Sequence, residues 1–263
     1  MAACAVLMVQ QTSLLLQGAS SPPDFIRFVF FSTLCSYSFH YYFTTHSVIP
    51  SDRVEWIQQN RPVLAFLFIT GLACAVFYLL QLSGYLLWLP AAVATFLYSA
   101  PKIPHPLLRQ LRKIAIGKTI FLAFIWMYVT AVLPVITAGN TWNVNNSIFG
   151  GSRFFYIYAI CILFDYRDRD DDRADGVKSL ITFLNEKNID RLFIFSLLAY
   201  LFLTILLLQF GISLVNTIIL LAPGIIVAAL YNYGKKNFAD ILYFIVLDGL
   251  LALSAAALLI ARI

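Results

Sequence analysis

The sequence contains little charge. Asp, Glu, Lys and Arg make up 12% of its 263 residues, whereas a soluble globular domain carries about 25%. Because so few charges cannot cover a water-exposed surface of this size, soluble enzymes, nucleic-acid-binding domains and disordered proteins are excluded. Hydrophobic residues make up 61% of the chain. The composition therefore predicts an integral membrane protein that crosses the bilayer several times.

Paired cysteines and a basic patch are also missing. The four cysteines (Cys4, Cys35, Cys74 and Cys161) lie far apart in apolar stretches, without CxxC spacing. They predict neither a disulfide framework nor a metal site. The formal net charge is +5, but the cations lie in loops between apolar runs rather than in one patch. We therefore expect no nucleic-acid partner.

Nine apolar runs predict membrane helices. They cover residues 2–16, 25–43, 63–81, 84–99, 119–137, 148–164, 191–209, 211–230 and 238–260. The first run is short and is interrupted by polar residues, among them Gln10 and Thr12. The seventh and eighth runs meet at residues 209–211, which predicts a tight helical hairpin. We expect an all-α polytopic membrane protein that forms one domain over residues 1–263.

The distribution of cations predicts the orientation in the membrane. With nine spans, 15 of the 18 Lys and Arg residues fall in or beside the loops on one side. The positive-inside rule places these loops in the cytoplasm, with the N-terminus inside and the C-terminus outside. The same loops predict cytoplasmic cap elements. Residues 100–118 have the pattern of an interfacial amphipathic helix, and residues 52–60 that of a short helix capped by Ser51.

An acidic cluster follows the sixth run. Six of the thirteen acidic residues fall between residues 165 and 175. If the helix continues, Asp165, Asp168 and Asp172 share one face, whereas Asp170 and Asp171 point elsewhere. Carboxylates at this spacing repel one another, and Mg²⁺ would reverse the effect, since it is typically held by one or two carboxylates plus substrate phosphates. The alternative is a solvated acidic loop that is neutralised by its interleaved arginines.

The cluster resembles a known motif. Residues 165–180 read DYRDRDDDRADGVKSL, which is similar to D-x-x-D-x-x-x-D-R-x-x-G-x-x-[ST]-L, the second Asp-rich motif of the UbiA superfamily of intramembrane prenyltransferases. Residues 98–102, YSAPK, are similar to the family's Tyr…Lys segment, whose lysine approaches the diphosphate. The resemblance implies nine transmembrane helices around a central cavity, with a cytoplasmic active site. It also implies Mg²⁺-dependent ionisation of an isoprenyl diphosphate and transfer of the prenyl group to an aromatic or lipid acceptor, in a protein that sits in the lipid bilayer.

The resemblance also implies roles for individual residues. Asp165, Asp168 and Asp172 are the candidate catalytic residues and magnesium ligands. The candidate diphosphate-binding cations are Lys102, Arg112, Arg173 and Lys178. The positive-inside bias accounts for each of these four cations equally well. The acceptor stays unidentified.

One part of the family pattern is missing. Where the first Asp-rich motif, N-D-x-x-D-x-x-x-D, is expected, residues 38–46 contain no carboxylate, and their neutral side chains suit Mg²⁺ poorly. The candidate substrate-pocket residues are His40, Tyr42, His46, Tyr98 and Trp126. Three hypotheses remain. They are a prenyltransferase in which histidine or tyrosine contacts the diphosphate, a terpene cyclase in which aromatic side chains stabilise the cation, and a non-catalytic relative that binds isoprenoid lipids.

One carboxylate lies within the last apolar run. Asp248 stands in the sequence FIVLDGLL, residues 244–251. Intramembrane carboxylates are rare and are functional by default. Two interpretations stay open. Asp248 accepts a proton from the cation intermediate, or it is protonated and hydrogen-bonded to a neighbouring helix.

Overall fold

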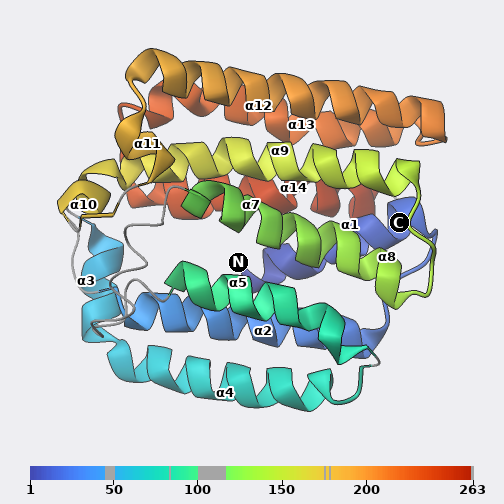
Figure 1. The fold of residues 1–263 in the computed structure, drawn as a ribbon, viewed down its shortest axis with the longest axis horizontal. Coiled ribbons are helices and arrows are strands. Elements are labelled where there is room, and N and C mark those ends of the chain that lie inside the picture. Colours follow the sequence, from blue (N-terminus) through green and yellow to red (C-terminus); the bar gives the residue numbers. More distant parts are fainter. Residues whose placement is uncertain (45–50, 83, 100–116, 175, 178, 262–263) are drawn as a thin grey trace.

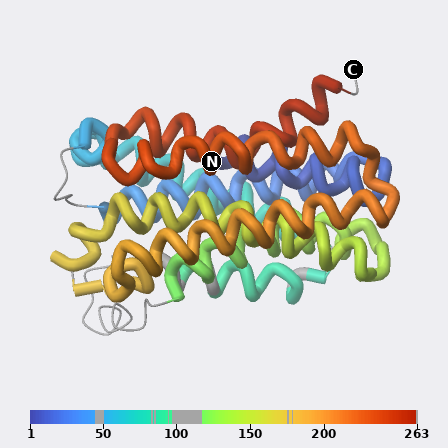
Figure 2. The backbone as a smooth tube through the Cα atoms, turned by 90° about the horizontal axis from the view of Figure 1, so that it is seen from above, coloured from blue at the N-terminus to red at the C-terminus, as the bar shows by residue number. Residues whose placement is uncertain are grey.

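The protein folds into a bundle of long helices that share one axis (Figure 1). The computed structural model describes residues 1–44, 51–82, 84–99, 117–174, 176–177 and 179–261. Within these ranges it contains helices and no strand. The helices stay aligned when the bundle is turned by 90° (Figure 2). This architecture agrees with the all-α prediction.

The longer helices form the body of the bundle. They are α1 (Ala2–Leu16), α2 (Pro23–Tyr42), α4 (Arg61–Leu79), α5 (Leu89–Ser99), α7 (Lys118–Met127), α9 (Val144–Arg167), α12 (Glu186–Leu206), α13 (Leu214–Gly234) and α14 (Asp248–Ile260). Shorter helical segments extend or connect them. These are α3 (Asp52–Gln59), η1 (Tyr85–Trp88), η4 (Tyr128–Val132), α8 (Leu133–Thr137), α10 (Arg169–Ala174), α11 (Leu180–Phe183), η5 (Leu207–Phe210) and η6 (Leu242–Leu247).

Each of the nine predicted runs lies on a helix of the described chain. Six helical segments are long and apolar enough to cross a membrane, which fits an integral multi-pass membrane protein. They are Arg61–Leu79, Lys118–Thr137, Val144–Arg167, Glu186–Phe210, Leu214–Gly234 and Leu242–Ile260. Of the others, α1 has 15 residues and α5 has 11. The 20-residue α2 falls short in hydropathy rather than length. Nine crossings and their orientation stay predictions.

The polar residues of α1 make contacts inside the bundle. Pro134 has no N–H group, so the carbonyl of Thr130, four residues earlier, lacks its usual helical donor. Thr12 Oγ1 of α1 donates to this carbonyl at 2.6 Å. Ser254 Oγ of α14 donates to Gln11 Oε1 at 3.3 Å. The polar residues that weaken the first apolar run therefore join α1 to its neighbours.

The predicted hairpin between the seventh and eighth runs is confirmed. Gly211 adopts φ +87°, a left-handed conformation that glycine accepts without strain, and α13 starts three residues later. The Ser213 side chain accepts a hydrogen bond from the Asn216 N–H and caps α13. α12 and α13 lie side by side and both contact α9, at the top of the bundle in Figure 1.

A close contact between α12 and α13 gives a stability prediction. A Cβ on Gly224 would lie 2.9 Å from Tyr200 Cδ1 and closer still to Cε1. Tyr200 is fully buried, and its hydroxyl donates to the Leu220 carbonyl. The ring therefore cannot move aside, and Gly224→Ala is expected to destabilise the protein by about 1–3 kcal/mol. The melting temperature of the purified protein measures this effect.

Gly249→Ala is the matched control. Gly249 lies in α14, and a Cβ there would meet nothing within 4 Å. Alanine is the better helix former by about 1 kcal/mol, so this variant is expected to melt at or above the wild-type temperature. Equal melting temperatures for the two variants would contradict the close packing of α12 on α13.

Candidate functional site

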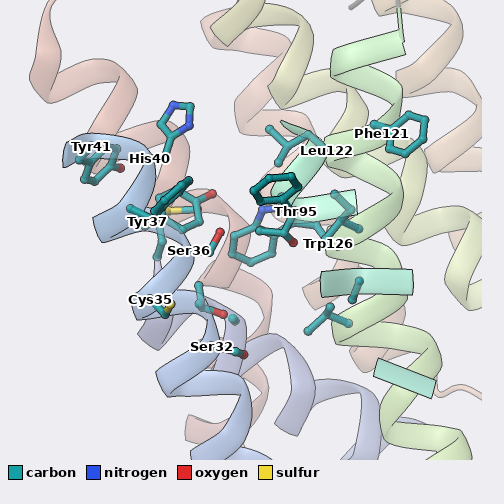
Figure 3. A pocket seen from close by; sticks show the side chains of 18 of the residues that line it. Ser32, Cys35, Ser36, Tyr37, His40, Tyr41, Thr95, Phe121, Leu122 and Trp126 are labelled. Atoms are coloured by element: carbon teal, nitrogen blue, oxygen red, sulfur yellow. The ribbon is translucent and has the colours of Figure 1, made fainter. Parts of the chain in front are cut away.

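A cavity of about 1160 Å³ lies between the helices. It is larger than the roughly 300–1,000 Å³ typical of small-molecule sites. Its lining comes from α2, α4, α5, α7, α9 and α14 and is mostly apolar and aromatic. Figure 3 shows Ser36 and Tyr37 of α2 facing Thr95 of α5 and Trp126 of α7. The ring centroids of Tyr37 and Trp126 are 6.4 Å apart.

Four aspartates, Asp165, Asp168, Asp171 and Asp172, line the cavity where α9 passes into α10, and we call them the acidic wall. The spacing predicted that three of them share a side, and all three do line the cavity. The prediction that Asp171 points elsewhere is wrong. The helix is interrupted at Asp168, since α9 ends before this residue and α10 starts after it. The regular helical spacing on which that prediction rested therefore does not extend to Asp171.

The acidic wall lies at the end of the bundle where α3, α10 and α11 gather, on the left in Figure 1. Hydrogen bonding continues across the break between α9 and α10, since the Asp172 N–H donates to the Asp168 carbonyl at 2.8 Å. The remaining described aspartate of the cluster, Asp170, has a side chain 59% exposed and pairs with Arg173. The cluster is therefore divided between a cavity side and a solvent side.

Lys118, the first residue of α7, lies against the acidic wall. Its Nζ is 3.1 Å from Asp172 Oδ1 and 3.7 Å from Asp165 Oδ1. The neighbouring Thr119 hydroxyl donates to Asp165 Oδ2. Both aspartates are buried, so the ammonium supplies positive charge that these carboxylates need. We did not predict Lys118 as a site residue, because in the sequence it is one of several loop cations.

The predicted magnesium ligands belong to the acidic wall, and their surroundings show whether they fit that role. Among the described residues, no group of three or more His, Cys, Asp or Glu side chains is arranged to hold a metal ion. The Lys118 ammonium lies between two of the candidate carboxylates. The donor chemistry still fits Mg²⁺, which is held by one or two carboxylates when substrate phosphates and water complete its shell. Asp168 and Asp172 are the residues that fit this role.

The structure places some predicted residues in the cavity and others outside it. His40 and Trp126 line the cavity. Tyr42 is outside the described lining and is 38% exposed. It follows His40 by two residues, about 200° around α2, and so faces away. Arg173 is also outside the lining, with a side chain 52% exposed and an ion pair to Asp170 at 3.4 Å.

The remaining predicted residues cannot be placed at the cavity. Lys102, Arg112, Lys178 and His46 lie outside the described residues, as does most of the predicted amphipathic helix over residues 100–118. Tyr98 belongs to α5, of which only the backbone is described at that position. Their roles stay predictions.

Arg53 is a second cation that sequence reasoning missed. It follows the short helix cap at Ser51 and lines the cavity. Its guanidinium lies 4.2 Å from the ring centroid of Tyr41 and 3.6 Å from that of Phe244. Such stacking holds an arginine head group in place. Arg53 therefore brings a positive charge to the cavity shortly after the segment that lacks the first Asp-rich motif.

Asp240 fixes the segment that carries Arg53. Its carboxylate accepts hydrogen bonds from Ser51 Oγ at 2.9 Å and from the Arg53 N–H at 3.0 Å. It also forms an ion pair with Arg167 at the end of α9. The start of α3, the end of α9 and the chain before η6 are thus joined beside the cavity. The predicted helix over residues 52–60 is confirmed as α3, with Ser51 accepting from the Val54 N–H.

A second ionic network supports the acidic wall from outside. Glu186 pairs with Arg169, which follows Asp168, at 2.7 Å and with Lys235 at 2.8 Å. Lys235 also pairs with Asp190 at 2.8 Å. Partial burial opposes the charge on Lys235, but the hydrogen bonds to Asp190 and Glu186 outweigh it and raise the pKa of the ammonium. The network therefore keeps its charges near neutral pH and ties α10 to α12 and α13.

Comparisons with known proteins agree with this fold. The model of the UbiA prenyltransferase family matches residues 42–247, which is most of the chain. The structure of a UbiA homologue from Archaeoglobus fulgidus superimposes with a TM-score of 0.66 and 13% sequence identity. The match covers 97% of this chain and 95% of that chain. No curated protein sequence matches. At this identity the structural likeness establishes the fold and no more.

Proposed function

Because the chain belongs to the UbiA prenyltransferase family, we propose that it ionises an isoprenyl diphosphate inside the membrane and transfers the prenyl group to an acceptor. One observation carries the proposal. A large apolar cavity ends at an acidic wall with a lysine beside it. An isoprenyl diphosphate likewise consists of a long apolar chain with a charged group, the diphosphate, at one end.

The polar end of the cavity is where the diphosphate binds. Lys118 and Arg53 both line the cavity there and supply hydrogen-bond donors with positive charge. Charge-assisted hydrogen bonds to phosphate are stronger than neutral ones. Lys118 is already paired with Asp172, so a bound diphosphate shares or takes over this ammonium. The prenyl chain then lies along the apolar lining between α2 and α7.

The acidic wall would hold the magnesium ion of this proposal. Asp168 and Asp172 are the residues that hold the ion, together with phosphate oxygens. When bound, Mg²⁺ supplies electrostatic stabilisation to the charge that develops on the leaving diphosphate. The Lys118 ammonium, which pairs with Asp172, would add to this stabilisation. Electrostatic stabilisation of this kind is usually the largest catalytic contribution.

The apolar part of the cavity protects the allylic cation. Tyr37 and Trp126 present aromatic rings across the cavity (Figure 3). Aromatic faces attract cations by about 0.5–2 kcal/mol. The surrounding apolar side chains exclude water, which would otherwise capture the cation. The acceptor must therefore reach the cavity before or together with ionisation.

Product analysis tests the transfer. The purified protein is incubated with geranylgeranyl diphosphate and Mg²⁺, with and without candidate phenols or quinone precursors, and lipids are identified by mass spectrometry. A prenylated acceptor supports the proposal. A hydrocarbon or cyclic alcohol formed without acceptor would show a terpene cyclase instead. Diphosphate binding with no turnover in any mixture would show a non-catalytic isoprenoid-binding protein.

A further inference from the structure

Asp248 is a carboxylate of the cavity that the binding scheme above does not use. It lines the cavity together with Leu251, one turn further along α14. The other four described aspartates of the lining belong to the acidic wall. No hydrogen bond or ion pair joins the Asp248 carboxyl to another described side chain. A carboxyl group that faces an apolar cavity without a hydrogen bond or ion pair is costly to keep, so it calls for a function.

Asp248 lies close in the chain to a residue that packs beside the acidic wall. Phe244, one turn before it, packs against Phe164 of α9 with ring centroids 5.8 Å apart, and Phe164 directly precedes Asp165. Asp248 therefore follows, by about one helical turn, a residue that packs beside the acidic wall. The first carbons of a prenyl chain follow the diphosphate directly. They and an acceptor atom meet close to that wall.

Two positive charges act on this position, the N-terminal ammonium of Met1 and the guanidinium of Arg53. The Arg53 guanidinium stacks on Phe244, on the same helix as Asp248 and one turn away. Arg53 is held there by Tyr41 and by the hydrogen bond from its N–H to Asp240. His40 of α2 also lines the cavity, and an imidazole can accept a proton.

We propose that Asp248 is the proton acceptor of the transfer reaction, an inference that rests on the proposed function. The allylic C–O bond breaks, and its electron pair leaves on the diphosphate. The prenyl carbon bonds to the acceptor atom, and that atom's proton passes to an Asp248 carboxylate oxygen. The acceptor therefore belongs to the class of molecules that carry a proton on the reacting atom, as phenols do. Asp248 later returns the proton to water.

Replacement of Asp248 separates this step from ionisation. In Asp248→Asn, pyrophosphate release from geranylgeranyl diphosphate is expected to stay within about tenfold of wild type, because the acidic wall is intact. The yield of prenylated acceptor, the coupled product, is expected to fall by about 10²-fold or more. Prenyl alcohol is expected in its place, because water captures the cation. Asp248→Glu keeps a carboxyl and is expected to recover part of the coupling.

Cys4→Ala is the packing control, since Cys4 Sγ donates to the Asp248 backbone carbonyl at 3.6 Å and lies outside the described lining. The Cys4→Ala variant is expected to form as much prenylated acceptor as the wild-type protein. Undiminished coupled product in Asp248→Asn, or loss of coupling in His40→Gln alone, would overturn the inference while leaving the proposed function intact. Absence of pyrophosphate release from the wild-type protein would instead overturn the proposed function, and this inference with it.

Discussion

Asp172→Asn is expected to lower pyrophosphate release from isoprenyl diphosphates by about 10²–10³-fold. Asp172 lines the cavity, is 8% exposed and pairs with Lys118 at 3.1 Å. Asparagine keeps the size of the side chain but removes the negative charge that a magnesium ion and Lys118 require. Asp168→Asn is expected to have the same effect, since Asp168 lines the same wall. Steady-state assays with saturating Mg²⁺ measure both losses.

Asp170→Asn is the matched control for this prediction. Asp170 belongs to the same acidic cluster, but its side chain is 59% exposed and pairs with Arg173 on the solvent side. Its replacement is expected to leave turnover within about twofold of wild type, since exposed ion pairs contribute little. Equal activity in the Asp170, Asp168 and Asp172 variants would contradict the assignment of the acidic wall as the diphosphate and metal site.

Lys118→Met is expected to cost both activity and stability. Within the part of the chain that the structure describes, Lys118 is the cation that lies against Asp165 and Asp172, and both carboxylates are buried. Without the ammonium, two buried negative charges face each other, and loss of one partner of a buried pair costs about 3–5 kcal/mol. The diphosphate also loses a donor, so that turnover is expected to fall by about 10²-fold.

Comparison with two other lysine variants makes the measurement specific. Lys187→Met removes an exposed lysine at the start of α12 and is expected to leave melting temperature and turnover unchanged. Lys118→Arg retains the charge and is expected to keep more stability than activity, because a guanidinium has a different shape. High activity in Lys118→Met would show that Lys118 serves folding alone.

Local sequence patterns predicted much of this structure. The apolar runs marked the helices, Ser51 marked the start of α3, and Gly211 marked the hairpin between α12 and α13. These features depend on residues that are close in the chain, and so their physical causes are visible in the sequence. The spacing of Asp165, Asp168 and Asp172 likewise brought all three to the cavity.

Long-range contacts escaped prediction. Lys118 and Asp172 are 54 residues apart in the chain, and nothing in the sequence around Lys118 distinguishes it from the other loop cations. The interruption between α9 and α10 at Asp168 is not marked by glycine or proline in the sequence. Thr12 reads as an interruption of a helix until its bond to the Thr130 carbonyl is known. Such pairings are set by tertiary packing.

Metal-dependent release of pyrophosphate tests the central claim, that the cavity ionises an isoprenyl diphosphate at the acidic wall. The measurement uses purified wild-type protein in lipid nanodiscs with farnesyl or geranylgeranyl diphosphate, first with Mg²⁺, then with excess EDTA, then with Mg²⁺ restored. We predict release with Mg²⁺, loss with EDTA and recovery on restoration. Release that EDTA does not affect would contradict the magnesium site. No release from either diphosphate, with or without candidate acceptors, would contradict the claim that this chain is an enzyme.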